Sequence, residues 1–198
     1  INLLASALFL IGLGMIYGSV GSLNMADVAR LMPTLAEDQH KLAVAGGLML
    51  FVVFGIKAAI LPVGFWLPKT YAVATTPVAA LFTIMTKVGV YAILRINGTV
   101  FDDEYSHQIL MNCLLVIGLV TSVYGVICAI GTERLRRFVG FMVLSSVGTI
   151  LVAIGLNNTA AWAGAIYYLV HSTLIAAAFY ILSGWITSQR GEFKDHFK

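Results

Sequence analysis

Six long runs of hydrophobic residues, separated by shorter polar segments, dominate this chain. Each run has about 20 residues or more, the length of helix that crosses the hydrocarbon core of a bilayer. The runs are apolar on all sides, unlike a surface helix with a single apolar stripe. We therefore predict an all-α fold, a polytopic transmembrane helix bundle, with spans at residues 2–23, 42–65, 77–96, 108–130, 137–156 and 160–187.

Composition agrees with this pattern. Of the 198 residues, 60% are hydrophobic and 11% are charged, whereas soluble domains have about 25% charged residues. A transmembrane β-barrel would need alternating polar and apolar residues, which no segment shows. The net charge is +3, most of the positive charges lie in the segments between the runs, and no basic patch is interleaved with aromatics. We therefore expect a lipid bilayer, and no nucleic acid, around this chain.

The second span is interrupted by Pro62, five residues after Lys57. Proline removes a backbone hydrogen bond and breaks or kinks a helix. One interpretation is a broken helix that lines a wet cavity, as in many transporters. The other is that Pro62 merely ends the span near the interface. Pro77 marks a second break before the third span, and the polar segment 24–41 could hold a short interfacial helix capped by Asn24.

The orientation follows from the positive charges of the loops, which are enriched on the cytoplasmic side. One side carries seven of them, Lys69, Arg134, Arg136, Arg137, Arg190, Lys194 and Lys198. The other carries three, Arg30, Lys41 and Arg95, beside the acidic run 102–104. We therefore predict that residues 131–137 and the C-terminus are cytoplasmic and that residues 97–107 are external.

Three ionisable residues, Lys57, Lys87 and His171, lie away from the ends of the predicted apolar segments, and no acidic residue lies at that depth. A charge at the bilayer centre costs roughly 2.5–3.5 kcal/mol, so such groups usually mark an ion or proton path. Two lysines on neighbouring spans would disfavour simultaneous protonation. The alternatives are lysines that extend to an interface and a histidine satisfied within the interior.

Hydroxyl groups accompany these three residues. With water, hydroxyls can link titratable groups into a proton relay. Alternatively, they only bond carbonyl groups of their own helix. The candidate supporting residues are Thr83, Thr86 and Tyr91 near Lys87, Tyr167, Tyr168, Ser172 and Thr173 near His171, and Ser145 with its neighbours Ser146 and Thr149.

The stretch 55–95 resembles the core of the antiporter-like subunits shared by respiratory complex I, membrane-bound hydrogenases and Mrp-type cation/proton antiporters. The family pattern has a lysine five residues before a proline, then W-L-P, P-V-S-A-L, a lysine before G-V-Y, and an arginine. The matching residues, in order, are Lys57, Pro62, 66–68, 77–81, Lys87, 89–91 and Arg95. The later segments ERLRRFVGF and YLVHSTLIAAAFYILSG are also similar to the family.

Details favour the D subunit of Mrp-type sodium/proton antiporters within this family. Complex I relatives usually have L-P-x-A-H, where this chain has Tyr71. They often carry a lysine where this chain has Ile175 and a histidine where it has Ser146, so those two relay roles do not transfer. Ala79 replaces the usual serine.

The resemblance implies a role for each ionisable residue. Lys57 would be the lysine of the broken helix, Lys87 the central lysine of the next helix, and His171 the relay histidine. The family's glutamate on an earlier helix and its ionisable residue on a later broken helix do not fall in this sequence. Residues 1–198 would form a single transmembrane domain, about the sixth to eleventh helix of an inverted-repeat fold of roughly fourteen.

The sequence thus predicts a proton-translocating membrane subunit of a multisubunit cation (sodium)/proton antiporter in the cell (inner) membrane. It would be a transporter subunit rather than an enzyme, with no catalytic residues, cofactor or metal site. Its partners would be other membrane subunits, protons, sodium and lipid. One alternative is a proton-pumping subunit in the membrane arm of complex I or a hydrogenase. The other is a structural membrane scaffold.

Overall fold

The computed structural model describes residues 2–100 and 104–189, apart from the side chains of 97–99 and 104–106. All regular secondary structure in these residues is helical. The elements are α1 (Asn2–Val20), α2 (Met25–Leu31), η1 (Met32–Thr34), α3 (Glu37–Ala58), η2 (Val63–Phe65), α4 (Trp66–Val73), α5 (Thr76–Val100), α6 (Glu104–Ile130), α7 (Leu135–Gly155) and α8 (Thr159–Gln189).

Six segments of the described chain are long and apolar enough to cross a membrane, which confirms the six predicted spans. The second covers α3 through α4, Glu37–Val73. The loop predicted at 97–107 is shorter than expected, because α5 and α6 extend into it. Helix backbone hydrogen bonds do not stop where the apolar run stops, so helices continue into polar flanks. Residues 101–103 and the tail 190–198 lie outside the described residues.

The broken helix predicted near Pro62 is confirmed. Helix α3 ends at Ala58, and Ala59 adopts a positive φ of 59°. The chain then passes through η2 and resumes a helix as α4, so Pro62 does not simply end the span. Pro77 lies in the first turn of α5, where a proline is tolerated because the first N–H groups of a helix have no acceptor within it.

The short helix predicted after Asn24 is also present. Its Oδ1 accepts a hydrogen bond from the backbone N–H of Ala26 at 3.0 Å and caps α2. Such a cap satisfies one of the N–H groups left free at a helix start.

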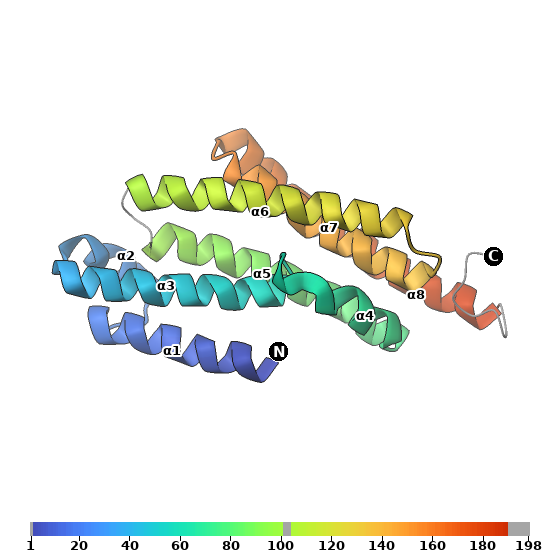
Figure 1. The fold of residues 1–198 in the computed structure, drawn as a ribbon, viewed down its shortest axis with the longest axis horizontal. Coiled ribbons are helices and arrows are strands. Elements are labelled where there is room, and N and C mark those ends of the chain that lie inside the picture. The colour runs from blue at the N-terminus through green and yellow to red at the C-terminus, as the bar shows by residue number, and fades with distance from the viewer. Residues whose placement is uncertain (1, 101–103, 190–198) are drawn as a thin grey trace. The chain divides into compact units, whose positions relative to one another are not determined.

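The described chain divides into two compact units. The first contains α1, α2, η1 and α3 up to Lys57, with residues 89–110 of α5 and α6. Helices α1 and α3 lie side by side and run antiparallel (Figure 1). A Cβ atom on Gly46 would lie 2.8 Å from the carbonyl oxygen of Gly12, so the two backbones meet where neither residue has a side chain.

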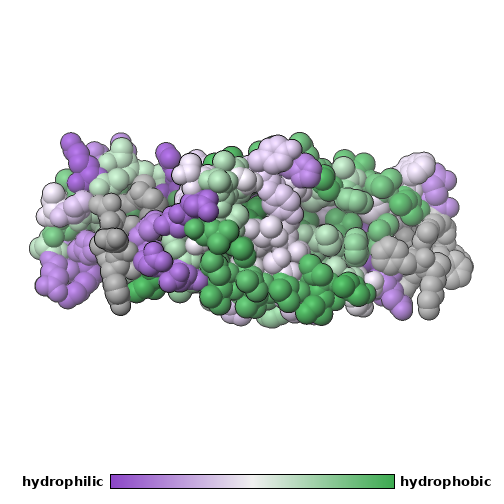
Figure 2. Space-filling model, turned by 90° about the horizontal axis from the view of Figure 1, so that it is seen from above, coloured by the Kyte–Doolittle hydropathy of each residue, from purple (hydrophilic) through white to green (hydrophobic). Residues whose placement is uncertain are grey.

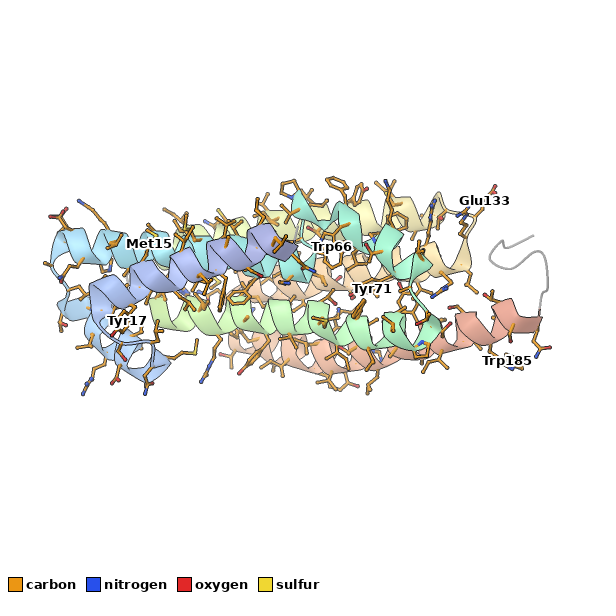
Figure 3. The ribbon with its side chains drawn as sticks, turned by 90° about the horizontal axis from the view of Figure 1, so that it is seen from below. Met15, Tyr17, Trp66, Tyr71, Glu133 and Trp185 are labelled. Atoms are coloured by element: carbon orange, nitrogen blue, oxygen red, sulfur yellow. The ribbon has the colours of Figure 1, made fainter. Side chains whose placement is uncertain are left out.

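The second unit contains residues 58–88 and 111–198, and α7 forms its centre. Helix α7 packs against α4 and α8. On another side it meets α6 at closely spaced glycines, Gly118 and Gly125 of α6 with Gly148 and Gly155 of α7. Trp66 and Tyr71 lie on the short helix α4 (Figure 3), and Tyr71 is part of the core that joins α4, α5, α7 and α8.

Hydrophobic side chains make up much of the visible surface (Figure 2). Helix α8 exposes several large ones, Ile166, Val170, Leu174, Ile181 and Trp185. In water such a surface would be unfavourable, but it suits a helix that contacts lipid or other membrane helices. The structure thus describes a multi-pass membrane protein.

Candidate functional site

Lys87 lies within α5 and is buried, with 2% of its surface exposed. Its Nζ donates a hydrogen bond to the Oγ of Ser146 on α7 at 2.5 Å. The hydroxyl of Ser146 in turn donates to the carbonyl oxygen of Val143 at 2.7 Å. No acidic residue in the described part of the chain pairs with Lys87. Its ammonium group is therefore held by a neutral oxygen rather than by a countercharge.

Two threonines on α5 share the buried environment of this lysine. Thr83 and Thr86 are both fully buried. Their hydroxyls donate to carbonyl oxygens of their own helix, that of Ala80 at 2.7 Å and that of Thr83 at 2.8 Å. Both threonines therefore follow the alternative in which a hydroxyl only bonds a carbonyl group of its own helix. Tyr91, the third predicted neighbour, is 56% exposed.

Lys57 occupies the last turn of α3, directly before the helix break. Its Nζ donates to the Oδ1 of Asn2 on α1 at 2.9 Å. The last carbonyl groups of a helix lack partners within it and carry partial negative charge, which favours a cation there. The break thus places a lysine where the backbone itself stabilises its charge.

The break is fixed by a residue of α6. The backbone N–H of Leu61 donates to the Oγ1 of Thr121 at 3.2 Å, and the hydroxyl of Thr121 donates to the carbonyl oxygen of Ile117 at 2.7 Å. Thr121 is fully buried. An unpaired N–H group in lipid costs several kcal/mol. The hydroxyl of Thr121 therefore supplies the acceptor that the N–H of Leu61 lacks where the helix is interrupted.

Further hydroxyls lie where α6 meets α7. The Oγ of Ser122 is 3.4 Å from the Oγ of Ser145 and 3.4 Å from the Oγ1 of Thr149. Ser145, a predicted supporting residue, precedes Ser146, the acceptor for Lys87, in the chain. The two helices therefore share a row of hydroxyl groups.

His171 on α8 is exposed in the described chain. Its ring stacks on that of Tyr167 with centroids 5.9 Å apart, and it lies 6.3 Å from the ring of Tyr168. Ser172 and Thr173 both donate to the carbonyl oxygen of Leu169 within their own helix. The structure thus brings His171 together with the two predicted tyrosines, while the relay role of these residues stays a prediction.

A second cluster of polar side chains, partly buried, lies where α4, α5, α7 and α8 meet. The guanidinium group of Arg136 donates to the carbonyl oxygen of Ala74, at the end of α4. The hydroxyl of Tyr71 donates to the carbonyl oxygen of Phe82 at 2.6 Å, and its ring lies 5.9 Å from that of Tyr180. The hydroxyl of Tyr180 is buried without a hydrogen-bond partner in the described part of the chain.

Three residues of the site, Ser146, Asn2 and Thr121, have roles that the sequence alone did not predict. Ser146 stood out among the hydroxyls but had no assigned partner, although its place in the hydroxyl-rich SSVGT segment was a usable signal. Asn2 and Thr121 gave no signal, because their contacts bridge 55 and 60 residues. Only tertiary packing reveals them.

The fold and the site define a class of protein, a multi-pass helical membrane protein with a broken helix and a buried lysine on the next helix. The chain belongs to the NADH:quinone oxidoreductase/Mrp antiporter transmembrane family, whose sequence model matches residues 1–198.

Within that family, the similar proteins include D subunits of antiporters. The chain is 43% identical over 184 residues to the D subunit of a "Probable K(+)/H(+) antiporter" of Rhizobium meliloti, covering 92% of this chain and 34% of the relative. It is 35% identical over 198 residues to the D subunit of the "Na(+)/H(+) antiporter" of Bacillus subtilis, covering 98% of this chain and 39% of the relative. The chain thus spans between a third and two fifths of these relatives.

Solved structures agree. A chain of the Mrp complex from Dietzia sp. superimposes with a TM-score of 0.82 at 31% identity, covering 94% of this chain and 34% of that one. A chain of an archaeal respiratory membrane complex, the membrane-bound sulfane sulfur reductase, superimposes with a TM-score of 0.81 at 24% identity, covering 92% of this chain and 37% of that one. At 24% identity, the match to the second structure shows a shared fold only.

Proposed function

We propose that this chain is the central part of a proton-translocating membrane subunit of a multisubunit cation/proton antiporter. Lys57, Lys87 and His171 are its relay groups. The observation that carries the proposal is the buried ammonium of Lys87, bonded to the neutral hydroxyl of Ser146 without an acidic partner in the described part of the chain. A charge buried in this way is costly and usually functional.

The chemistry of lysine suits this role. Unlike arginine, lysine can lose its proton inside a protein, so Lys87 can both receive and release one. The hydroxyl of Ser146 orients the ammonium without neutralising it. Because this neutral partner does not cancel it, the charge of Lys87 interacts strongly with any other charge that arrives nearby in this low-dielectric interior. This is the physical basis on which cation movement can be coupled to proton movement.

The names of the relatives support both potassium and sodium as the exchanged cation. We propose sodium, with the other subunits of an Mrp-type complex as partners. The seven positive charges counted on one side of the spans support a cytoplasmic location for residues 131–137 and the C-terminal tail in the cell membrane.

A membrane-arm subunit of a redox-driven proton pump is the second candidate. It is favoured by the fold likeness to the archaeal respiratory membrane complex. In that case the same lysines would move protons, but redox chemistry in other subunits would drive them.

The test uses the full-length subunit in its complete complex, in inside-out membrane vesicles with a pH-sensitive dye. Addition of sodium or potassium to energised vesicles should dissipate the proton gradient. Lys87→Ala and Lys87→Arg should both abolish this response while the complex still assembles, since neither variant offers an exchangeable proton. A normal response in Lys87→Ala would favour the scaffold alternative. If neither sodium nor potassium dissipates the proton gradient in vesicles with the unaltered complex, the redox-driven candidate is favoured.

A further inference from the structure

Asn2 is the first residue of α1 and Lys57 lies in the last turn of α3, and because these helices run antiparallel the two residues meet at the same end of the pair. The Nζ of Lys57 donates to the Oδ1 of Asn2 at 2.9 Å. Both residues belong to membrane-spanning segments. Asn2 is the first residue of its span and is exposed in the described chain, whereas Lys57 is half-buried.

The contact follows from how α1 and α3 pack. Gly12 faces Gly46 where the backbones approach, and about three turns of helix separate this point from Asn2. Between them, Ala5 packs with Val53 and Ile56, and the rings of Phe9 and Phe54 meet edge to face with centroids 6.0 Å apart. The antiparallel register is therefore set along the whole helix pair (Figure 1). In this register position 2 of α1 falls opposite position 57 of α3.

The chemistry of an amide differs from that of a carboxylate at this place. A carboxylate would hold Lys57 in its charged form, whereas an amide oxygen is a neutral acceptor that orients the ammonium through one of its three N–H groups. In the described part of the chain, no acidic residue pairs with Lys57. The remaining two N–H groups can bind other partners.

We propose that Asn2 is a positioning residue for Lys57, whose amide oxygen holds the ammonium at the end of α3 while the proton remains exchangeable. The inference rests on the proposed relay function of Lys57. It adds a residue of α1 to the machinery of the broken helix.

The experiment compares four variants of the full-length subunit in the assembled complex. Asn2→Leu removes the acceptor at similar size, and Asn2→Gln keeps an amide. Ser6→Ala, on an exposed position one turn further along α1, is the matched control. Lys57→Ala tests the underlying function. Cation-driven proton transport is measured against pH in inside-out vesicles, with the amount of assembled complex determined in the same membranes.

We expect Asn2→Leu to lower transport about tenfold, as for loss of a hydrogen bond to a charged group, and to alter its pH profile. Asn2→Gln should keep most of the activity, and Ser6→Ala should transport normally. Normal transport with an unaltered pH profile in Asn2→Leu, while Lys57→Ala is inactive, overturns the role of Asn2 alone. Normal transport in Lys57→Ala overturns the relay role of Lys57 and this inference with it.

Discussion

Lys87 and Ser146, 59 residues apart in the chain, are joined by a hydrogen bond of 2.5 Å between the ammonium of α5 and the hydroxyl of α7. Both side chains are buried. This contact is a direct route by which α7, the central helix of the second unit, can influence the buried lysine.

The first prediction concerns this contact. Ser146→Ala leaves the buried ammonium of Lys87 without its oxygen partner, which is costly in an apolar interior. We expect a loss of transport of about tenfold, with the complex still assembled. Ser146→Thr keeps the hydroxyl and should retain activity. Equal activity of the alanine and threonine variants would show that the contact is dispensable.

The second prediction concerns the helix break. Thr121→Val has nearly the shape of threonine but cannot accept the hydrogen bond from the N–H of Leu61. We expect it to destabilise the purified complex by about 1–3 kcal/mol, seen as a lower midpoint of thermal unfolding in detergent. Thr121→Ser keeps the hydroxyl and should remain close to the unaltered protein. If valine and serine give the same midpoint, the break does not depend on this hydroxyl.

A third prediction uses two glycines with different surroundings. A Cβ atom at Gly148 of α7 would overlap the backbone of Ser122 and Gly118 on α6, whereas one at Gly164 of α8 would meet nothing within 4 Å. Gly148→Ala should therefore lower stability by about 1–3 kcal/mol or more, and Gly164→Ala should leave it unchanged or raise it. The midpoint of thermal unfolding separates the two, and equal values would contradict the close contact of α6 with α7.

The fourth prediction contrasts two buried tyrosines. The hydroxyl of Tyr71 donates to the carbonyl oxygen of Phe82, but that of Tyr180 has no partner in the described residues. Tyr71→Phe should destabilise the complex by about 0.5–1.5 kcal/mol, whereas Tyr180→Phe removes an unsatisfied polar group and should be neutral or stabilising. A larger loss of stability in Tyr180→Phe than in Tyr71→Phe would contradict the observed hydrogen bonds.

The last prediction concerns orientation. Single cysteines at positions 103 and 134 are introduced after replacement of Cys113, Cys128 and any other cysteine. The excess of positive charge around residues 131–137 predicts that a membrane-impermeant reagent labels position 103 but not position 134 in intact cells. Inside-out vesicles serve as the control and should show the opposite labelling. Labelling of position 134 in intact cells would mean that the orientation is inverted.

The sequence predicted the fold well because membrane spans depend on a local property, about 20 consecutive apolar residues. Pro62 indicated the break for the same reason, since a proline acts on its own helix. Asn24 indicated the cap of α2, because a cap also acts within a few residues.

The contacts within the candidate site were harder to predict from the sequence than the fold. Lys57, Lys87 and His171 could be chosen because a charge in an apolar run is visible without a structure. Their partners could not, because Ser146, Asn2 and Thr121 depend on which helix faces lie against each other. Hydropathy is nearly uniform around these helices, so their facing sides leave little trace in the sequence.

The hydroxyl of Ser146 has a single hydrogen atom, and that atom is directed at the carbonyl oxygen of Val143 while the oxygen accepts from Lys87. A peptide carbonyl does not take up a proton at neutral pH. In this arrangement the hydroxyl of Ser146 cannot pass on a proton from Lys87, so it holds the ammonium in place rather than relaying its proton. For Ser146 to donate a proton to any other acceptor, its hydroxyl would first have to rotate away from the carbonyl oxygen of Val143.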